Sequence, residues 1–135
     1  MVIKTLNRRS AEYQELAAEP SNRIFNIDRR SPLGNPFPMP NESTRDLACE
    51  LYAHYFLKTY ERERRFYADY EPDSLPFFTL LTEILANAEF GDVYLACWCA
   101  PKRCHGETIQ TVVNYAIEKG LPLTEIPSKE LRKIL

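Results

Sequence analysis

Long apolar runs are absent from this sequence. Its first nine residues, MVIKTLNRR, are broken by charge after a few positions, whereas a secretory signal needs an apolar run of about 7–15 residues. Nor does any segment approach the roughly 18 consecutive apolar residues of a membrane helix. We therefore expect a protein that is not exported by this route, has no membrane partner and resides in the cytoplasm.

A strong excess of charge of either sign is also lacking. The chain has 17 Lys and Arg against 19 Asp and Glu, which gives a net charge of −2. Proteins drawn to nucleic acid by their overall field are usually basic, so the net charge does not support a nucleic-acid partner. The arginines nevertheless occur in clusters, such as Arg8-Arg9 and Arg29-Arg30, and a local basic patch is compatible with this composition.

Glycine is scarce, with 4 residues, whereas proline is not, with 10. The segment SPLGNPFPMP, residues 31–40, holds several of those prolines and one glycine, and prolines exclude regular structure there. Since proline also narrows the unfolded ensemble, the composition predicts a rigid loop that holds Asn35 in a defined pose.

Hydrophobic periodicity predicts one α/β domain over residues 1–135, a small Rossmann-like three-layer fold with a mostly parallel central sheet. For one helix the pattern places four residues on the buried face, namely Leu47, Leu51, Tyr55 and Phe56. The predicted strands are 2–6, 23–27, 93–97 and 123–126, and the longer predicted helices are 44–66, 74–87 and 107–119. The run VYLAC at 93–97 is apolar throughout, as in a strand covered on both faces.

Three of the four cysteines and one of the two histidines fall within the stretch CWCAPKRCH, directly after that strand. Ligands of α/β folds bind beyond the carboxyl ends of the strands, which is where this motif lies. In a chain expected to be cytoplasmic, such cysteines indicate free thiols, metal binding or catalysis before disulfides.

The spacing of these cysteines does not favour zinc. Tetrahedral zinc with Zn–S of about 2.3 Å needs its sulfurs about 3.8 Å apart, whereas same-face neighbours in a strand are about 6.6 Å apart. Cys97 and Cys99 could therefore share a metal only if the chain turned at Trp98. We assign no metal ligand and no cofactor from the sequence, and zinc stays an alternative.

Cys104, His105 and Gly106 precede a predicted helix, whose unpaired N–H groups and dipole favour an anion or a thiolate. Either Cys104 or Cys99 could then be a nucleophile, with His105 or Glu107 moving protons. Gly106 would let a ligand approach the backbone closely. The alternative is structural: small cysteines fill the core, Trp98 packs on the opposite face, and the polar residues cap the turn.

The motif and several other segments resemble the DUF4326 family of phage and bacterial proteins, and more distantly the DUF488 family. The matching pieces span residues 2 to about 116: Asn7-Arg8, NIDRRSPLGNPF at 26–37, Thr44-Arg45, Tyr52, Tyr55 and CWCAPKRCHGE at 97–107. Residues 61–76 and 120–135 look like additions of this member. The resemblance implies a compact Rossmann-like domain and, if the gene belongs to a phage, a location in the host cytoplasm. It implies no particular reaction.

The matching pieces carry polar residues at loop or helix starts. If these converge, they form a pocket for a small anionic ligand such as a nucleotide or nucleoside, with ligand-binding residues Asn7, Arg8, Ser31, Gly34, Asn35, Arg45, Cys97 and Gly106 and catalytic residues Cys99, Cys104, His105 and Glu107. The leading hypothesis is a nucleotide- or nucleoside-processing enzyme, a thiol-dependent hydrolase or transferase. The alternatives are a non-enzymatic module that sequesters a nucleotide or binds a partner, and a zinc-stabilised interaction domain.

Overall fold

A three-stranded parallel sheet, in the order β1-β3-β2, forms the base of the molecule in the computed structural model, which describes residues 3–100 and 102–135. The strands are β1 (Ile3–Asn7), β2 (Arg23–Asn26) and β3 (Val93–Cys97). The strands predicted at 2–6, 23–27 and 93–97 are thus confirmed, apart from Val2, which lies outside the described residues. The parallel pairing of the sheet is also confirmed.

The central position of β3 explains its composition. It pairs with β1 in the register Ile3↔Val93 and with β2 in the register Arg23↔Val93. Val93 and Leu95 are fully buried, and Cys97 is nearly so. An uninterrupted apolar run is what a strand flanked by two others and covered by helices requires.

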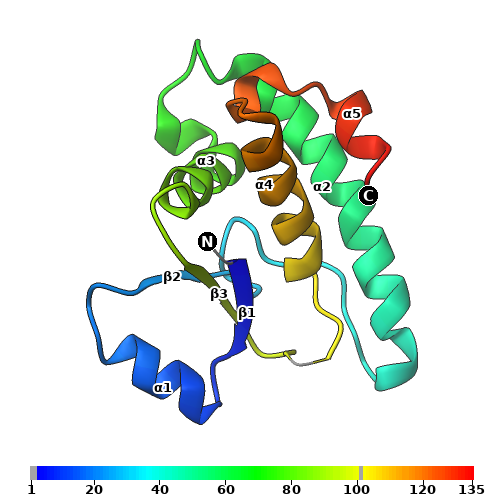
Figure 1. Ribbon diagram of the computed structural model, residues 1–135. Helices are drawn as coiled ribbons and strands as arrows, with labels where there is room; N and C mark the ends of the chain where they lie inside the picture. Colours follow the sequence, from blue (N-terminus) through cyan, green and yellow to red (C-terminus); the bar gives the residue numbers. More distant parts are fainter. Residues whose placement is uncertain (1–2, 101) are drawn as a thin grey trace.

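Helices supply most of the remaining structure: α1 (Ala11–Ala17), α2 (Arg45–Phe66), α3 (Pro76–Ala88), α4 (Gly106–Lys119) and α5 (Ser128–Arg132). Helices α2 to α5 gather together, while α1 lies apart from them (Figure 1). Helix α1 buries none of its residues. The protein is therefore a mixed α/β domain with a small parallel sheet, and the Rossmann-like three-layer arrangement stays a prediction.

No helix in the described part of the chain combines the length and apolar character needed to span a bilayer.

Helix α2 has the predicted extent, but its predicted buried face is partly wrong. Leu47 and Leu51 are 56% and 38% exposed, whereas Tyr52, Phe56 and Tyr60 are fully buried. These three aromatic residues follow one another at intervals of four and therefore share one face of the helix. Large aromatic side chains bury more apolar area than leucines, and they determine which face of α2 is turned inward.

The strand predicted at residues 123–126 is also wrong, because Leu123–Glu125 forms a short 3₁₀ helix. Two backbone carbonyls of this segment accept hydrogen bonds from helix α2. The hydroxyl of Tyr60 on α2 donates to the carbonyl oxygens of Leu123 and Ile126, both at 2.7 Å. A short alternating pattern cannot reveal such a partner, so the local signal was misleading here.

Candidate thiol site

The carboxyl ends of the three strands meet at one edge of the sheet, and the cysteine motif lies there as predicted. Strand β1 ends at Asn7, β2 at Asn26 and β3 at Cys97. Asp28 follows β2 closely, and its carboxylate accepts a hydrogen bond from Arg8, which follows β1, at 2.9 Å. The residues that follow the three strands therefore lie at the same edge of the sheet.

The chain turns immediately after Cys97, and Asn7 holds this turn in place. The Asn7 side-chain amide donates to the carbonyl oxygen of Ala100 at 2.9 Å and to that of Trp98 at 3.3 Å. Farther along, the N–H of Lys102 donates to the carbonyl of Cys99 at 3.0 Å. Pro101, which is part of the motif, lies outside the described residues.

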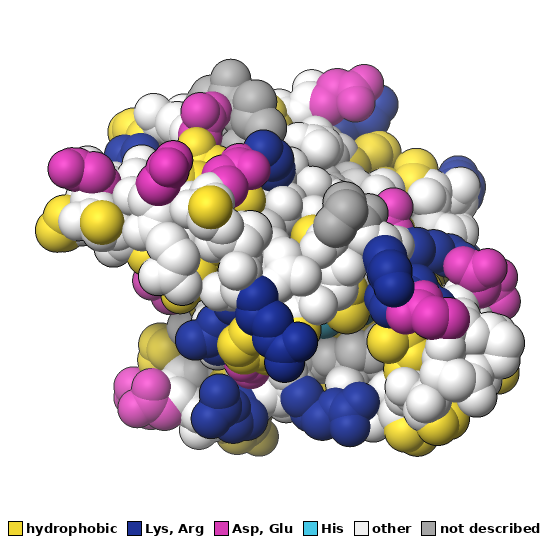
Figure 2. Space-filling view, turned by 90° about the horizontal axis from the view of Figure 1, so that it is seen from below, with side chains coloured by type: hydrophobic (Ala, Val, Ile, Leu, Met, Phe, Trp, Pro, Cys, Tyr) yellow, Lys and Arg dark blue, Asp and Glu magenta, His cyan; other side chains and the backbone are white. Residues whose placement is uncertain are grey.

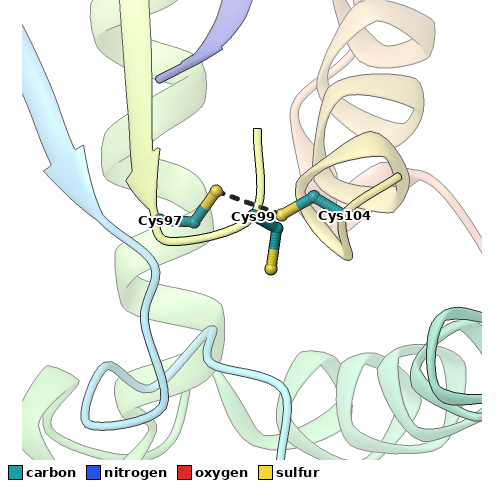
Figure 3. A group of neighbouring side chains, drawn as sticks. All are labelled: Cys97, Cys99 and Cys104. Atoms are coloured by element: carbon teal, nitrogen blue, oxygen red, sulfur yellow. Dashed lines mark hydrogen bonds between the residues drawn. The ribbon is translucent and has the colours of Figure 1, made fainter. Parts of the chain in front are cut away.

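This turn gathers three sulfur atoms. Cys97 lies at the end of β3, Cys104 just before α4 and Cys99 on the connecting loop; the Cys97 and Cys104 side chains point toward each other, and Cys99 lies beside them with its sulfur turned away from their contact (Figure 3). The three sulfurs all lie within 4.8 Å of one another, and those of Cys97 and Cys104 are 3.2 Å apart. The turn at Trp98 that a shared metal would require is therefore present. All four cysteines of the chain are free thiols.

Two of these thiols differ in their ionisation. The neighbouring thiols of Cys104 and Cys97 lower the pKa of Cys99 well below its ordinary value, and Arg45 acts in the same direction. Cys104 donates its S–H to Cys97, and this bond together with burial raises the pKa of Cys104. Of the two predicted nucleophiles, Cys99 is therefore the one whose surroundings favour the thiolate.

His105 is buried and held as a neutral imidazole. Its Nε2 lies 2.6 Å from the carbonyl oxygen of Ile27, so Nε2 must carry the proton and donate it. Burial lowers the pKa of His105 below its ordinary value. Nδ1 is then an acceptor, 3.5 Å from the sulfur of Cys104. Tyr52, whose ring lies 4.9 Å from the imidazole, packs against it from α2.

A cavity of about 290 Å³ opens beside the thiols. Its walls come from the loop after β2, the start of α2 and the cysteine motif. The lining residues are Asp28, Arg29, Asn35, Phe37, Met39, Arg45, Ala48, Cys49, Cys97, Trp98, Cys99, Arg103, Cys104 and His105. Figure 2 looks onto this edge of the molecule and shows Lys and Arg side chains gathered over it, with hydrophobic groups between them.

Six of the predicted site residues border this cavity, namely Asn35, Arg45, Cys97, Cys99, Cys104 and His105. Arg45 is already engaged: it forms two hydrogen bonds with Glu42, at 2.8 and 2.9 Å, and donates to the carbonyl of Arg103. The Asn35 amide donates to the carbonyl of Ala48 and accepts from the N–H of Phe37. Both residues thus shape the wall as well as border the space.

The other predicted site residues are not among those that line it. Arg8 pairs with Asp28, and its guanidinium lies 5.0 Å from the centre of the Trp98 ring. Ser31 and Gly34 form the turn of the proline-rich loop, where the N–H of Gly34 donates to the carbonyl of Ser31. Asn7 holds the turn after Cys97 through its two hydrogen bonds to the carbonyl oxygens of Trp98 and Ala100.

Gly106 and Glu107 lie at the start of α4, and neither is among the residues that line this cavity. A Cβ atom on Gly106 would lie 2.7 Å from the Thr5 side chain and 3.0 Å from Ile27, so this glycine lets α4 approach the sheet. Glu107 accepts a hydrogen bond from the N–H of Cys104 at 3.3 Å and borders a separate, more open cavity. Glu107 thus bonds to the segment just before α4, and its negative charge in the first turn is favourable for the helix dipole.

Several lining residues were not predicted from the sequence, among them Asp28, Arg29, Phe37, Trp98 and Arg103. Trp98 does not pack on the opposite face of the sheet: it is half-exposed, and Arg9 lies on its ring, 5.3 Å from the centroid. Asp28 and Arg29 belong to the same segment, NIDRRSPLGNPF, as Asn35, and this was the available signal. Among the described residues Arg29 forms no ion pair, whereas Arg103 pairs with Asp46 at 3.0 Å.

The lowered pKa of His105 predicts a specific loss of stability in acid. The unfolded chain takes up this proton near pH 6.5, before the folded protein does, so the stabilisation is complete above about pH 6.5 and is lost as the pH falls toward the folded value. His105→Gln keeps a donor for the Ile27 carbonyl but cannot titrate. We expect urea denaturation to show a smaller loss between about pH 7 and about pH 5 in the variant than in the wild type.

Other groups do not confuse this comparison. Cys99 also has a lowered pKa, but it makes the same contribution to the pH dependence of stability in both proteins. The pKa of Asp28 is lowered below its ordinary 3.8, since hydrogen bonding and charge from Arg30 outweigh the effect of burial, so Asp28 acts only at lower pH. If the wild type and His105→Gln lose the same unfolding free energy between about pH 7 and about pH 5, His105 is not buried as a neutral group.

The fold and the site together define a small α/β domain with a thiol-lined cavity at the carboxyl edge of a parallel sheet. The family model described as "Domain of unknown function (DUF4326)" matches residues 11–115. The chain therefore belongs to the DUF4326 family, as its motifs predicted. No curated protein and no solved structure matches it.

Proposed function

We propose that this protein is an enzyme that processes a small nucleotide or nucleoside, with the thiols at the cavity floor supplying the reactive centre. One observation carries the proposal: the Cys99 thiolate, the neutral His105 and the cation Arg29 all border the same cavity. Perturbed ionisable groups that converge in one cleft are typical of catalytic sites.

The size of the cavity limits the ligand. At about 290 Å³ it lies near the lower end of small-molecule pockets, which begin at roughly 300 Å³. A single nucleoside or mononucleotide suits this volume better than a dinucleotide cofactor. Phe37 and Trp98 provide aromatic surfaces against which a base can stack.

The charges of the walls favour an anionic group at the exposed side. Arg45 and Arg103 are each paired with a carboxylate, Glu42 and Asp46 respectively. Arg29 is exposed, and among the described residues its guanidinium bonds only to the carbonyl oxygen of Phe37, at 3.3 Å. A phosphate at the cavity mouth would therefore gain its main charge-assisted hydrogen bonds from Arg29.

Arg29→Ala tests the binding part of the proposal. Loss of a charge-assisted hydrogen bond, worth about 1.5–3 kcal/mol, should weaken binding of a nucleoside monophosphate by about 10-fold or more in isothermal titration calorimetry. Arg30→Ala is the matched control, because Arg30 has the same charge and is highly exposed but does not line the cavity. It should change the affinity little. Failure of wild-type protein to bind any nucleotide or nucleoside of a broad panel would refute the proposal.

A non-enzymatic module that sequesters a nucleotide is the second candidate. It is favoured by the place of Glu107, which accepts a hydrogen bond from the N–H of Cys104 and is not among the lining residues, and by the burial of His105. Proton transfer would then depend on groups other than a free carboxylate. Tight binding of a ligand that is recovered unchanged after long incubation would support this candidate over the enzyme.

A further inference from the structure

The three converging thiols have the dimensions of a metal site. Tetrahedral zinc with Zn–S of about 2.3 Å places its sulfur ligands about 3.8 Å apart. The sulfurs of Cys97 and Cys104 are 3.2 Å apart, and all three sulfurs, including that of Cys99, lie within 4.8 Å of one another. The required separation falls inside this range, so small side-chain rotations bring the three to one ion.

We propose that Cys97, Cys99 and Cys104 bind one zinc ion. The chemistry of the donors points to a thiophilic cation, because thiolates select zinc over magnesium or calcium. The objection from spacing no longer applies, since the chain leaves the extended conformation after Cys97. The Asn7 amide fixes this turn through two carbonyl oxygens, those of Trp98 and Ala100, so much of the geometry is present before any metal binds.

A positively charged side chain lies near the three thiols and could balance the net charge of such a site. Three thiolates and one divalent cation leave a single negative charge, which needs a nearby cation when it is partly buried. The guanidinium of Arg45 borders the same cavity as Cys99 and is itself mostly buried. Arg45 would then stabilise the metal-bound thiolate, which gives this predicted ligand-binding residue a second role.

The fourth coordination position faces the cavity. Among the described residues, no further His, Cys, Asp or Glu places a ligand atom within 4.8 Å of all three sulfurs. The three cysteines themselves border the cavity that also contains Arg29 and Trp98. Three protein ligands with one open position are the pattern of catalytic rather than structural zinc. The ion would thus meet the ligand of the proposed function, and only this last step rests on that proposal.

Metal analysis of the purified protein tests the site directly. We expect wild-type protein, reduced and incubated with zinc chloride before dialysis, to retain one zinc per chain by inductively coupled plasma mass spectrometry. Cys97→Ser, Cys99→Ser and Cys104→Ser should each lower the zinc affinity by about 100-fold or more. Cys49→Ser is the matched control, because Cys49 is a buried thiol on α2 outside the trio, and should retain the metal. A wild-type protein that retains no zinc would overturn the proposal.

A second measurement uses only the wild type, in case a variant does not fold. Iodoacetamide labelling followed by peptide mass spectrometry should show that zinc protects Cys97, Cys99 and Cys104 and leaves the labelling of Cys49 unchanged. Labelling of Cys99 that is as fast with zinc as without it would overturn the proposal. The two proposals fail separately: nucleotide binding by a protein that cannot hold zinc removes the metal site alone, and zinc binding without nucleotide binding removes the proposed function alone.

Discussion

In the proposed enzyme, replacing Cys99 with serine should lower turnover by about 10³-fold or more while the protein stays folded. Of the motif cysteines, Cys99 is the one whose surroundings favour the thiolate, through Cys104, Cys97 and Arg45. A serine hydroxyl stays neutral at any working pH, so it can neither attack as an anion nor bind a metal as a charged ligand. Loss of a group that acts directly on the reacting atoms has effects of this size.

The experiment compares turnover with folding and binding in the same samples. Far-UV circular dichroism and thermal melting should show Cys99→Ser folded, and calorimetry should show nucleotide affinity close to that of the wild type, because Arg29 and the aromatic walls are intact. The sequence left either Cys104 or Cys99 as the nucleophile. In the structure Cys104 is an S–H donor to Cys97, so Cys99 is the more direct target. A fully active Cys99→Ser enzyme would exclude a role for the thiolate.

Replacing Gly34 with alanine should destabilise the fold by at least about 2 kcal/mol. A Cβ atom at this position would lie 2.1 Å from the carbonyl oxygen of Asp28 and 2.8 Å from the Cα of Arg29. Both neighbours are backbone atoms, so no side-chain rotation relieves the clash. The proline-rich loop would have to move away from the segment after β2, and the cavity wall would move with it.

Gly91→Ala is the matched control for this prediction. Its added Cβ would meet only the guanidinium end of Arg23, at 3.0 Å, and that flexible side chain can move. Urea denaturation should show Gly34→Ala far less stable than Gly91→Ala. Equal stabilities would mean that the loop at Gly34 is not packed against the backbone as the structure has it.

Local patterns were sufficient for the central strand and the helix that follows it. The apolar run at 93–97 and the periodicity after Glu107 match β3 and α4 closely. Local patterns were insufficient where long-range contacts determine which face of a helix is buried or which conformation a segment adopts. The aromatic face of α2 outweighed Leu47 and Leu51, and hydrogen bonds from Tyr60 hold residues 123–126 in a non-strand conformation.

The candidate site shows the same difference between features that local sequence patterns predict and features that depend on long-range contacts. The motif itself indicated where the thiols lie, because three cysteines follow one buried strand. Their convergence could not be predicted, since the amide that holds the turn belongs to Asn7, 93 positions before its partner Ala100. Spacing alone treats the segment as extended and separates Cys97 from Cys99. Part of the cavity lining was missed for a similar reason: Arg29 comes near the thiols through the parallel pairing of β2 and β3.

Native mass spectrometry of gently purified protein, before and after addition of nucleoside monophosphates, tests most directly whether the thiol-lined cavity is a ligand site. We predict a chain that carries one small anionic ligand at the cavity and one zinc ion, with the ligand reduced by Arg29→Ala and the zinc by Cys99→Ser. A wild-type chain that has only its bare mass under all of these conditions would contradict the account.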